Sequence, residues 1–224
     1  SFGYLDESGT TVNTGYKRFS TRVNLDYFLS KKLLFSVKFN YTSSLTDRNV
    51  ELGRNIREMA YIKAPNMSIW EHDAQGNLTG ENFNPINSYQ GDGVTYFNPV
   101  AVARLGRRDE NFNKLENTFM LQYRLNDWIT LRETISFQYA GTKEKRFLPY
   151  NAIGADWLDW QINKAEEGNS LNQSIRTETQ LSFGSPFANQ DHQLSGAITW
   201  VTDQQSYEWM NIQSNKIPST DIQD

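Results

Sequence analysis

A strict two-residue alternation of apolar and polar side chains is the feature that most constrains how this chain can fold. It is clearest over residues 16–41, "YKRFSTRVNLDYFLSKKLLFSVKFNY". Most odd-numbered positions there carry an apolar side chain: Phe19, Val23, Leu25, Tyr27, Leu33, Phe35, Val37, Phe39 and Tyr41. Because successive side chains of a β-strand point to opposite faces, this period predicts two strands, each with one apolar and one polar face.

The same alternation recurs along the chain. It predicts six strands, at about 17–28, 33–42, 114–125, 129–139, 175–183 and 192–201. On one face of these strands 25 of 33 positions carry a large apolar residue, whereas on the other face five of 31 positions are apolar. This contrast predicts an all-β fold of antiparallel strands with two chemically opposite faces.

The connections between these strands are of two very different lengths. Short turns join the strands in pairs, whereas the segments 43–113 and 140–174 separate the pairs. Loops longer than about 12–15 residues are uncommon in compact soluble domains. Three hairpins with short turns at one end and long loops at the other are typical of an outer-membrane barrel wall. We expect short helices within these loops, at residues 54–63 and 156–168, and another loop after residue 201.

Composition excludes several other classes of protein. The chain of 224 residues has no cysteine, so disulfides and cysteine-based metal or redox sites are ruled out. Its net charge is −4, with the charges interspersed, so we expect no nucleic-acid partner. No apolar run approaches the roughly 18–20 residues of a membrane helix. The chain starts with neither a methionine nor a signal-peptide pattern, and we interpret it as part of a longer protein.

A soluble antiparallel sheet also alternates apolar and polar faces, so the periodicity alone leaves that alternative open. Aromatic residues near the strand ends favour a membrane wall, in which they form interfacial girdles. In hydrocarbon every backbone group must be paired, so such a sheet has to close into a barrel. Its other face would then line a wet lumen. We expect the following residues to face that lumen and to form cross-strand ion pairs: Arg18, Arg22, Lys38, Glu116, Arg124, Arg132, Arg176 and Glu178. Glu133 falls on the apolar face, where it would either face another subunit or lie beside a bulge.

Three segments resemble the barrel of the SusC/RagA family, the TonB-linked outer-membrane transporters of Bacteroides-type bacteria. They are "GYKRFSTRVNLDYFLSKKLLFSVKFNYTSS" (15–44), "APNMSIWEHDAQGN" (64–77) and "FNPVAVARLGRRDENFNKLENTFMLQYRLNDWITLRETISFQY" (97–139). Their order and spacing carry the resemblance, which covers nearly the whole chain.

The resemblance implies a role and a set of partners. It implies that residues 1–224 are the middle of a transmembrane barrel of about 22 strands, with long extracellular loops and with the plug domain and barrel closure outside this chain. It also implies TonB-dependent import of glycan fragments or oligopeptides across the bacterial outer membrane. The implied partners are TonB, through the plug, and a SusD-like lipoprotein lid.

The sequence predicts no enzyme activity and no catalytic, cofactor-binding or metal site. Aromatic residues of the long loops are the candidates for contact with a substrate or the lid: Trp70, Tyr89, Tyr96, Phe97, Trp157 and Trp160. Packing of the loops against one another is the alternative explanation for these rings. Two other functions stay open at this point: a soluble carbohydrate-binding β-sandwich, and a TonB-dependent receptor for a siderophore or vitamin.

Overall fold

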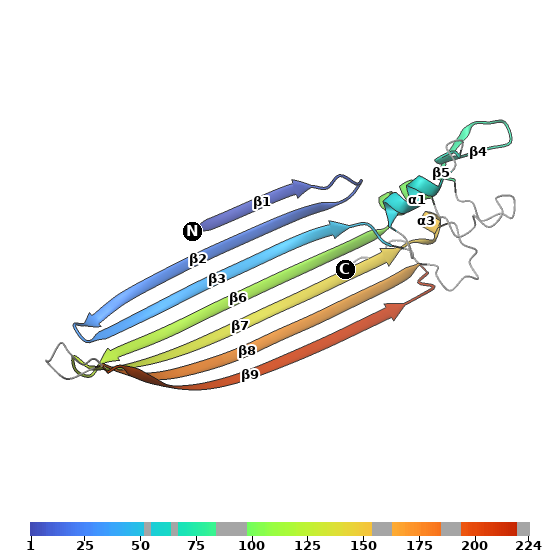
Figure 1. The fold of residues 1–224 in the computed structure, drawn as a ribbon. Helices are drawn as coiled ribbons and strands as arrows, with labels where there is room; N and C mark the ends of the chain where they lie inside the picture. Colours follow the sequence, from blue (N-terminus) through green and yellow to red (C-terminus); the bar gives the residue numbers. More distant parts are fainter. Residues whose placement is uncertain (52–54, 64–66, 84–97, 154–162, 185–193, 219–224) are drawn as a thin grey trace.

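The computed structural model describes residues 1–51, 55–63, 67–83, 98–153, 163–184 and 194–218. Seven long strands form one antiparallel sheet in the order β1-β2-β3-β6-β7-β8-β9 (Figure 1). They are β1 (Phe2–Ser8), β2 (Gly15–Ser30), β3 (Leu33–Arg48), β6 (Arg107–Arg124), β7 (Ile129–Leu148), β8 (Lys164–Phe183) and β9 (Gly196–Ser214). Each strand pairs with its neighbour along the chain, apart from the excursion between β3 and β6, so the sheet is an open meander with β1 and β9 at its edges.

The remaining elements gather at one end of this sheet (Figure 1). They are the helices α1 (Ile56–Ile62), α2 (Pro99–Leu105) and α3 (Tyr150–Ile153) and the small sheet of β4 (Trp70–His72) and β5 (Leu78–Asn82). We call this end the helix end, and the opposite end, where β2 turns into β3 and β6 into β7, the turn end. No helix in the described part of the chain is long and apolar enough to cross a bilayer.

Local chemistry explains the tight turns. Lys31 and Lys32 alone separate β2 from β3. Between β6 and β7 the carboxamide oxygen of Asn126 accepts hydrogen bonds from the backbone N–H groups of Trp128 and Ile129, at 3.0 and 2.8 Å. A side chain that bonds its own backbone two or three residues on stabilises a turn. The chain therefore reverses within a few residues at the turn end.

The strands extend further toward the helix end than the sequence predicts. β3 runs to Arg48 rather than 42, β6 starts at Arg107 rather than 114, β7 runs to Leu148 rather than 139, β8 starts at Lys164 rather than 175, and β9 runs to Ser214 rather than 201. The predicted loops 43–113 and 140–174 are therefore too long, and residues 202–214 belong to a strand. Backbone pairing continues without a register shift into these regions, where polar residues occupy both faces, so no hydropathy alternation marks them.

Of three smaller predictions, one is confirmed and two differ from the structure. β1 (Phe2–Ser8) is absent from the predicted strands, and it pairs with β2 through all seven of its residues. The predicted helix at 54–63 corresponds to α1, which starts at a capping box between Asn55 and Glu58. The predicted helix at 156–168 is wrong over residues 164–168, which are paired in β8, and its earlier part lies outside the described residues.

The buried apolar core is small and lies at the helix end. Val50, Val102, Leu148, Ala152 and Ile153 form one cluster, each at most 2% exposed. Among the described residues, Leu148 at the end of β7 is the one apolar side chain of the long sheet that is buried. The long sheet is therefore not built around a protein core, which raises the question of what covers its apolar side chains.

Candidate functional site

The strand register places most large apolar side chains of the sheet on one face, which we call the apolar face. Directly paired residues of neighbouring strands share a face. Val37, for example, pairs with Leu25 in β2 and with Phe119 in β6, which in turn pairs with Ile135 in β7. The apolar face comprises Phe19, Val23, Leu25, Tyr27, Leu33, Phe35, Val37, Phe39, Tyr41, Leu115, Phe119, Leu121, Tyr123, Ile129, Leu131, Ile135, Phe137, Tyr139, Ile175, Leu181, Phe183, Ile198 and Trp200.

No second layer covers the apolar face in the described part of the chain. Val23 is 50% exposed, Phe119 43% and Ile198 65%. Soluble monomers rarely expose contiguous apolar patches larger than a few hundred Å². A soluble β-sandwich would bury these side chains against a facing sheet. The exposed apolar face is instead the surface that a barrel strand presents to lipid.

Aromatic rings mark both ends of the apolar face. Tyr27 and Trp128 lie at the turn end, and Tyr41 and Tyr139 lie in one row across β3, β6 and β7 toward the helix end. Trp200 also lies near the turn end, because β9 starts at Gly196 and continues to Ser214. This arrangement is typical of the aromatic girdles at the two membrane interfaces.

Glu133 lies on the apolar face, as the sequence indicates, and the structure gives it a hydrogen-bond partner. It pairs with Leu121 of β6 and Thr179 of β8, with no register shift, so a bulge does not explain it. The hydroxyl of Thr179 donates a hydrogen bond of 2.5 Å to the Glu133 carboxylate. A hydrogen bond to an otherwise unpaired carboxylate lowers the cost of removing it from water.

Replacing Thr179 with valine is expected to lower barrel stability by about 1 kcal/mol, because Glu133 loses its donor on a lipid-covered face. Thr177→Val is the matched control: Thr177 lies on the same face of β8 and bonds Thr202, so its loss leaves no carboxylate unpaired. The folded fraction of the full-length transporter is measured by heat-modifiable migration in gels. A larger loss in the control would contradict this role of Thr179.

The opposite face, which we call the polar face, carries all eight side chains predicted to line a lumen. Their pairings place Arg18, Arg22, Lys38, Glu116, Arg124, Arg132, Arg176 and Glu178 on this side. The expectation of cross-strand ion pairs is met by Arg176 with Asp203, whereas the other described partners are carboxamides or charges on the same strand. Arg22 donates to the Asn40 carboxamide at 2.9 Å and Arg132 to that of Gln122 at 2.8 Å. Arg176 lies 3.8 Å from Glu178 and 4.0 Å from Asp203.

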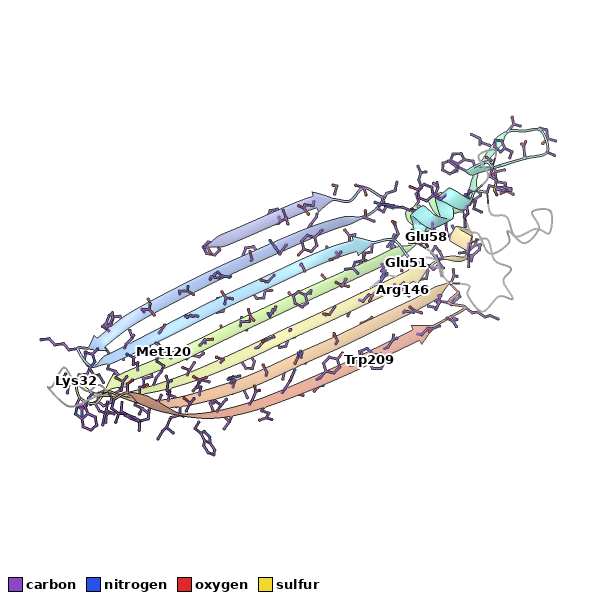
Figure 2. All side chains as sticks on the ribbon, viewed as in Figure 1. Lys32, Glu51, Glu58, Met120, Arg146 and Trp209 are labelled. Atoms are coloured by element: carbon purple, nitrogen blue, oxygen red, sulfur yellow. The ribbon has the colours of Figure 1, made fainter. Side chains whose placement is uncertain are left out.

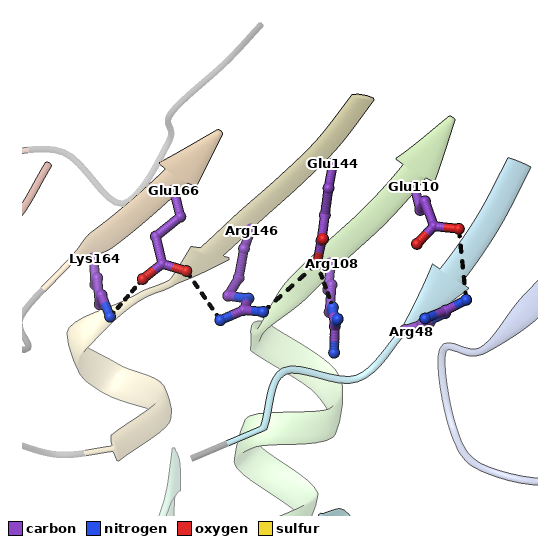
Figure 3. A network of polar contacts seen from close by, with 7 residues as sticks. All are labelled: Arg48, Arg108, Glu110, Glu144, Arg146, Lys164 and Glu166. Carbon is purple, nitrogen blue, oxygen red and sulfur yellow. Dashed lines mark hydrogen bonds and ion pairs between the residues drawn. The ribbon is translucent and has the colours of Figure 1, made fainter. Parts of the chain in front are cut away.

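A denser group of charges, which we call the ion-pair ladder, lies on the polar face at the helix end (Figure 3). It comprises Arg48, Arg108, Glu110, Glu144, Arg146, Lys164 and Glu166. Arg108 bonds Glu144 at 2.6 Å, and Arg146 bridges Glu144 and Glu166 at 3.5 and 2.9 Å. The sequence does not predict the ladder, because it links strand ends that lie beyond the predicted strands.

Two opposing effects set the protonation of Glu144, which lies beyond the apolar part of β7. Partial burial of its carboxyl acts to raise the pKa, but the hydrogen bond from Arg108 and the charges of Arg108 and Arg146 outweigh it and hold the pKa of Glu144 below its usual range. A lowered folded-state pKa contributes stability above the unfolded pKa, and this contribution is lost as the pH falls through the folded pKa.

Replacing Arg108 with glutamine is expected to make the helix end loosen at a higher pH during acidification. The pKa of Glu144 rises when its main partner is lost, so the carboxylate is protonated earlier as acid is added. Protease cleavage of the outer loops on intact cells, followed against pH, measures this shift. Arg132→Gln is the control, since Arg132 bonds a carboxamide. Identical pH profiles for wild type and Arg108→Gln would refute the role of the ladder.

The structure describes one of the six loop aromatics proposed for contact with substrate or lid. Trp70 lies in β4 of the small sheet, and the Arg104 guanidinium sits 5.2 Å from its ring centre. The other five, Tyr89, Tyr96, Phe97, Trp157 and Trp160, lie outside the described residues. Trp70 is thus held by a cation–π contact to α2, which restricts its ring.

An open antiparallel sheet with one exposed apolar face and one charged face is a stretch of outer-membrane β-barrel wall.

No family model matches the chain. In sequence it is similar to two proteins of Formosa agariphila, TonB-dependent receptor P39 (23% identity over 99% of this chain) and TonB-dependent receptor P26 (24% identity over 80%). The chain spans 20% and 16% of the lengths of these relatives.

The fold is similar to a part of two solved transporters. The RagAB peptide transporter matches 97% of this chain and 24% of its own, with 13% identity and a TM-score of 0.67. The RagAB peptide importer in the "closed-closed" state matches the same shares with 12% identity and a TM-score of 0.63. The resemblance to SusC/RagA-type, TonB-dependent transporters is thereby confirmed, and with it the bacterial outer membrane as the location.

Proposed function

We propose that this chain forms part of the barrel wall of an outer-membrane, TonB-dependent importer of nutrients, either glycan fragments or oligopeptides. The observation that carries the proposal is the exposed apolar face opposite a charged face. The apolar face contacts lipid, and the polar face lines the lumen through which the substrate passes. Similarity to two TonB-dependent receptors supports import as the activity.

The predicted lumen-facing charges fit this role. Arg22 and Arg132 donate to carboxamides, and Arg176 lies beside two carboxylates, so each guanidinium is partnered along the wall. The carboxylates beside Arg176 offset its charge, whereas Arg22 and Arg132 keep a net positive charge, and all three guanidinium groups keep the lumen hydrated. Their role is to line and stabilise the path rather than to bind one substrate.

The helix end faces outward and contacts a SusD-like lipoprotein lid. Support comes from exposed apolar side chains on its surface: Tyr61 is 87% exposed and Ile62 42% on α1, and Leu78 is 63% exposed on β5. Ile69 and Trp70 lie on the adjoining β4 segment. Apolar groups exposed beyond the membrane are typical of a protein contact site. TonB acts through a plug that lies outside this chain.

Uptake by cells tests the proposed function. Cells that lack the full-length transporter are expected to lose uptake of fluorescently labelled oligosaccharides or of labelled oligopeptides, and a protonophore is expected to stop the same uptake in wild type. Purification of the transporter from detergent extracts is expected to recover a lipoprotein. Unchanged uptake of both substrate classes, together with lost uptake of a siderophore or vitamin, would contradict the proposal.

A further inference from the structure

The side-chain amide of Asn13 bonds carbonyl groups at the end of α2. The last four C=O groups of a helix have no partner within that helix. One of them in α2, that of Val102, accepts from the Gly106 N–H at 3.0 Å. The Nδ2 atom of Asn13 donates to the next two, the carbonyl oxygens of Ala103 and Arg104, at 3.2 and 3.3 Å. The C-terminus of α2 is therefore capped by a residue that lies 90 positions before Ala103 in the chain.

The turn between β1 and β2, residues 9–14, holds Asn13 in this position. The backbone of Asn13 has a φ of 56°, a left-handed conformation that asparagine adopts more readily than most residues. The side chain of Asn49, which follows β3, donates to the carbonyl oxygen of Val12 at 3.0 Å. The turn is thereby tied to the end of β3 as well as to its own two strands.

The same turn also contacts α1. The Arg57 guanidinium donates a hydrogen bond to the Thr10 hydroxyl. Figure 1 shows the turn beside α1, and Figure 2 labels Glu58, the residue after Arg57, in the first turn of this helix. The β1–β2 turn therefore connects the long sheet with both α1 and α2.

α2 in turn contacts the β4 segment at two points. The side chain of Asn98, at the start of α2, donates to the carbonyl oxygen of Ile69 at 2.9 Å. The Arg104 guanidinium, in the last turn of α2, lies 5.2 Å from the ring centre of Trp70. Arg104 is also the residue whose carbonyl accepts from Asn13, so this one residue connects the β1–β2 turn with the Trp70 ring. Trp70 is half-buried, and part of its surface stays accessible to a partner.

We propose that Asn13 is a positioning residue for Trp70: by capping α2 from the β1–β2 turn, it keeps the Arg104 guanidinium on the ring and so presents Trp70 to the lipoprotein lid. This inference rests on the proposed function, which includes lid contact at the helix end. A ring that is already fixed loses less conformational freedom on binding than a mobile one, so fixing it strengthens the contact. Without the Asn13 amide, the last turn of α2 loses its cap and Arg104 leaves the ring.

The first measurement follows the ring itself. The full-length transporter is labelled with 5-fluorotryptophan, and the fluorine resonance of Trp70 is assigned by its loss in Trp70→Phe. Asn13→Gly keeps a left-handed backbone accessible and removes the amide. It is expected to shift the Trp70 resonance toward its position in Arg104→Gln, which has no cation on the ring. An unchanged Trp70 resonance in Asn13→Gly would overturn the inference.

The second measurement is titration of the full-length transporter with the lipoprotein that is recovered with it. Trp70→Ala is expected to weaken lid binding about tenfold or more. Asn13→Gly is expected to weaken it about threefold to tenfold, the range that the loss of one hydrogen bond gives. Because Asn13 acts through Trp70, Asn13→Gly is expected to have no further effect in the Trp70→Ala background. Equal effects of Asn13→Gly in the two backgrounds would refute this role.

Val12→Ala is the matched control, because Val12 adjoins Asn13, its side chain is exposed, and its bond to Asn49 uses the backbone carbonyl. It is expected to leave the Trp70 resonance and lid affinity unchanged, and effects equal to those of Asn13→Gly would count against the inference. Recovery of no lipoprotein with the wild type would overturn the lid contact of the proposed function, and this inference with it. A recovered lipoprotein that binds Trp70→Ala as tightly as wild type would overturn this inference alone.

Discussion

Replacing Val37 with arginine is expected to abolish assembly of the full-length transporter in the outer membrane. Val37 lies in the middle of the apolar face, directly paired with Leu25 on one side and Phe119 on the other. An arginine on the lipid face near the bilayer midplane costs about 2–4 kcal/mol. Immunoblots of fractionated outer membranes measure the amount assembled, and heat-modifiable migration measures the fraction that is folded.

The next residue along the chain is the control for this substitution. Lys38 lies on the polar face, paired with Asn24 and Thr118, where water is expected to surround it. Lys38→Ala removes a charge from the lumen side and is expected to leave outer-membrane levels near those of wild type. Equal losses for Val37→Arg and Lys38→Ala would contradict the assignment of the two faces.

Replacing Asn98 with alanine is expected to open the helix end locally, at a cost of about 3 kcal/mol. Asn98 is 5% exposed and caps α2, since its side-chain oxygen accepts from the N–H groups of Val100 and Ala101. Its side-chain nitrogen donates to the carbonyl oxygens of Ile69 and Phe83, both at 2.9 Å. Hydrogen exchange of the full-length transporter is expected to rise in both α2 and the β4–β5 hairpin.

Asn98→Asp separates the two roles of this side chain. Aspartate keeps an oxygen for the N-cap, so α2 is expected to retain its protection. It has no donor for the carbonyls of Ile69 and Phe83 and places a negative charge against them, so the hairpin alone is expected to exchange faster. Equal loss of protection in α2 for both variants would show that Asn98 does not act as its cap.

The sequence predicts the turn-end half of this sheet well, because there the two faces differ in polarity. Val37 and Lys38 differ so sharply in polarity that the alternation alone assigns them to opposite faces of the sheet. Toward the helix end the alternation ends: Asp47, Asp109 and Lys145 follow one another across the apolar side, and Arg48, Arg108 and Arg146 across the polar side. Backbone pairing extends the strands there without any hydropathy signal, which is why the predicted loops are too long.

The candidate sites differ in the same way, because some follow from the alternation and others depend on how the strands pair. The eight predicted lumen residues share one face because period-two alternation determines side. The ion-pair ladder depends on which residue of one strand lies opposite which residue of the next, and a single sequence carries no such information. In the sequence, the Asn98-Pro99 pair stands out only within a segment that resembles the SusC/RagA family. In the structure, this pair starts α2, and the Asn98 side chain caps the helix and anchors the β4–β5 hairpin.

Spin labels on single cysteines test most directly whether lipid covers the apolar face. The chain has no native cysteine, so labels can be placed one at a time along residues 33–42 of the full-length transporter in bilayers, in a background free of other cysteines. We expect labels at the odd positions to collide with oxygen dissolved in lipid, and labels at the even positions to collide with a water-soluble nickel complex. Odd positions shielded from both reagents would show that protein covers them, which would contradict lipid contact of the apolar face.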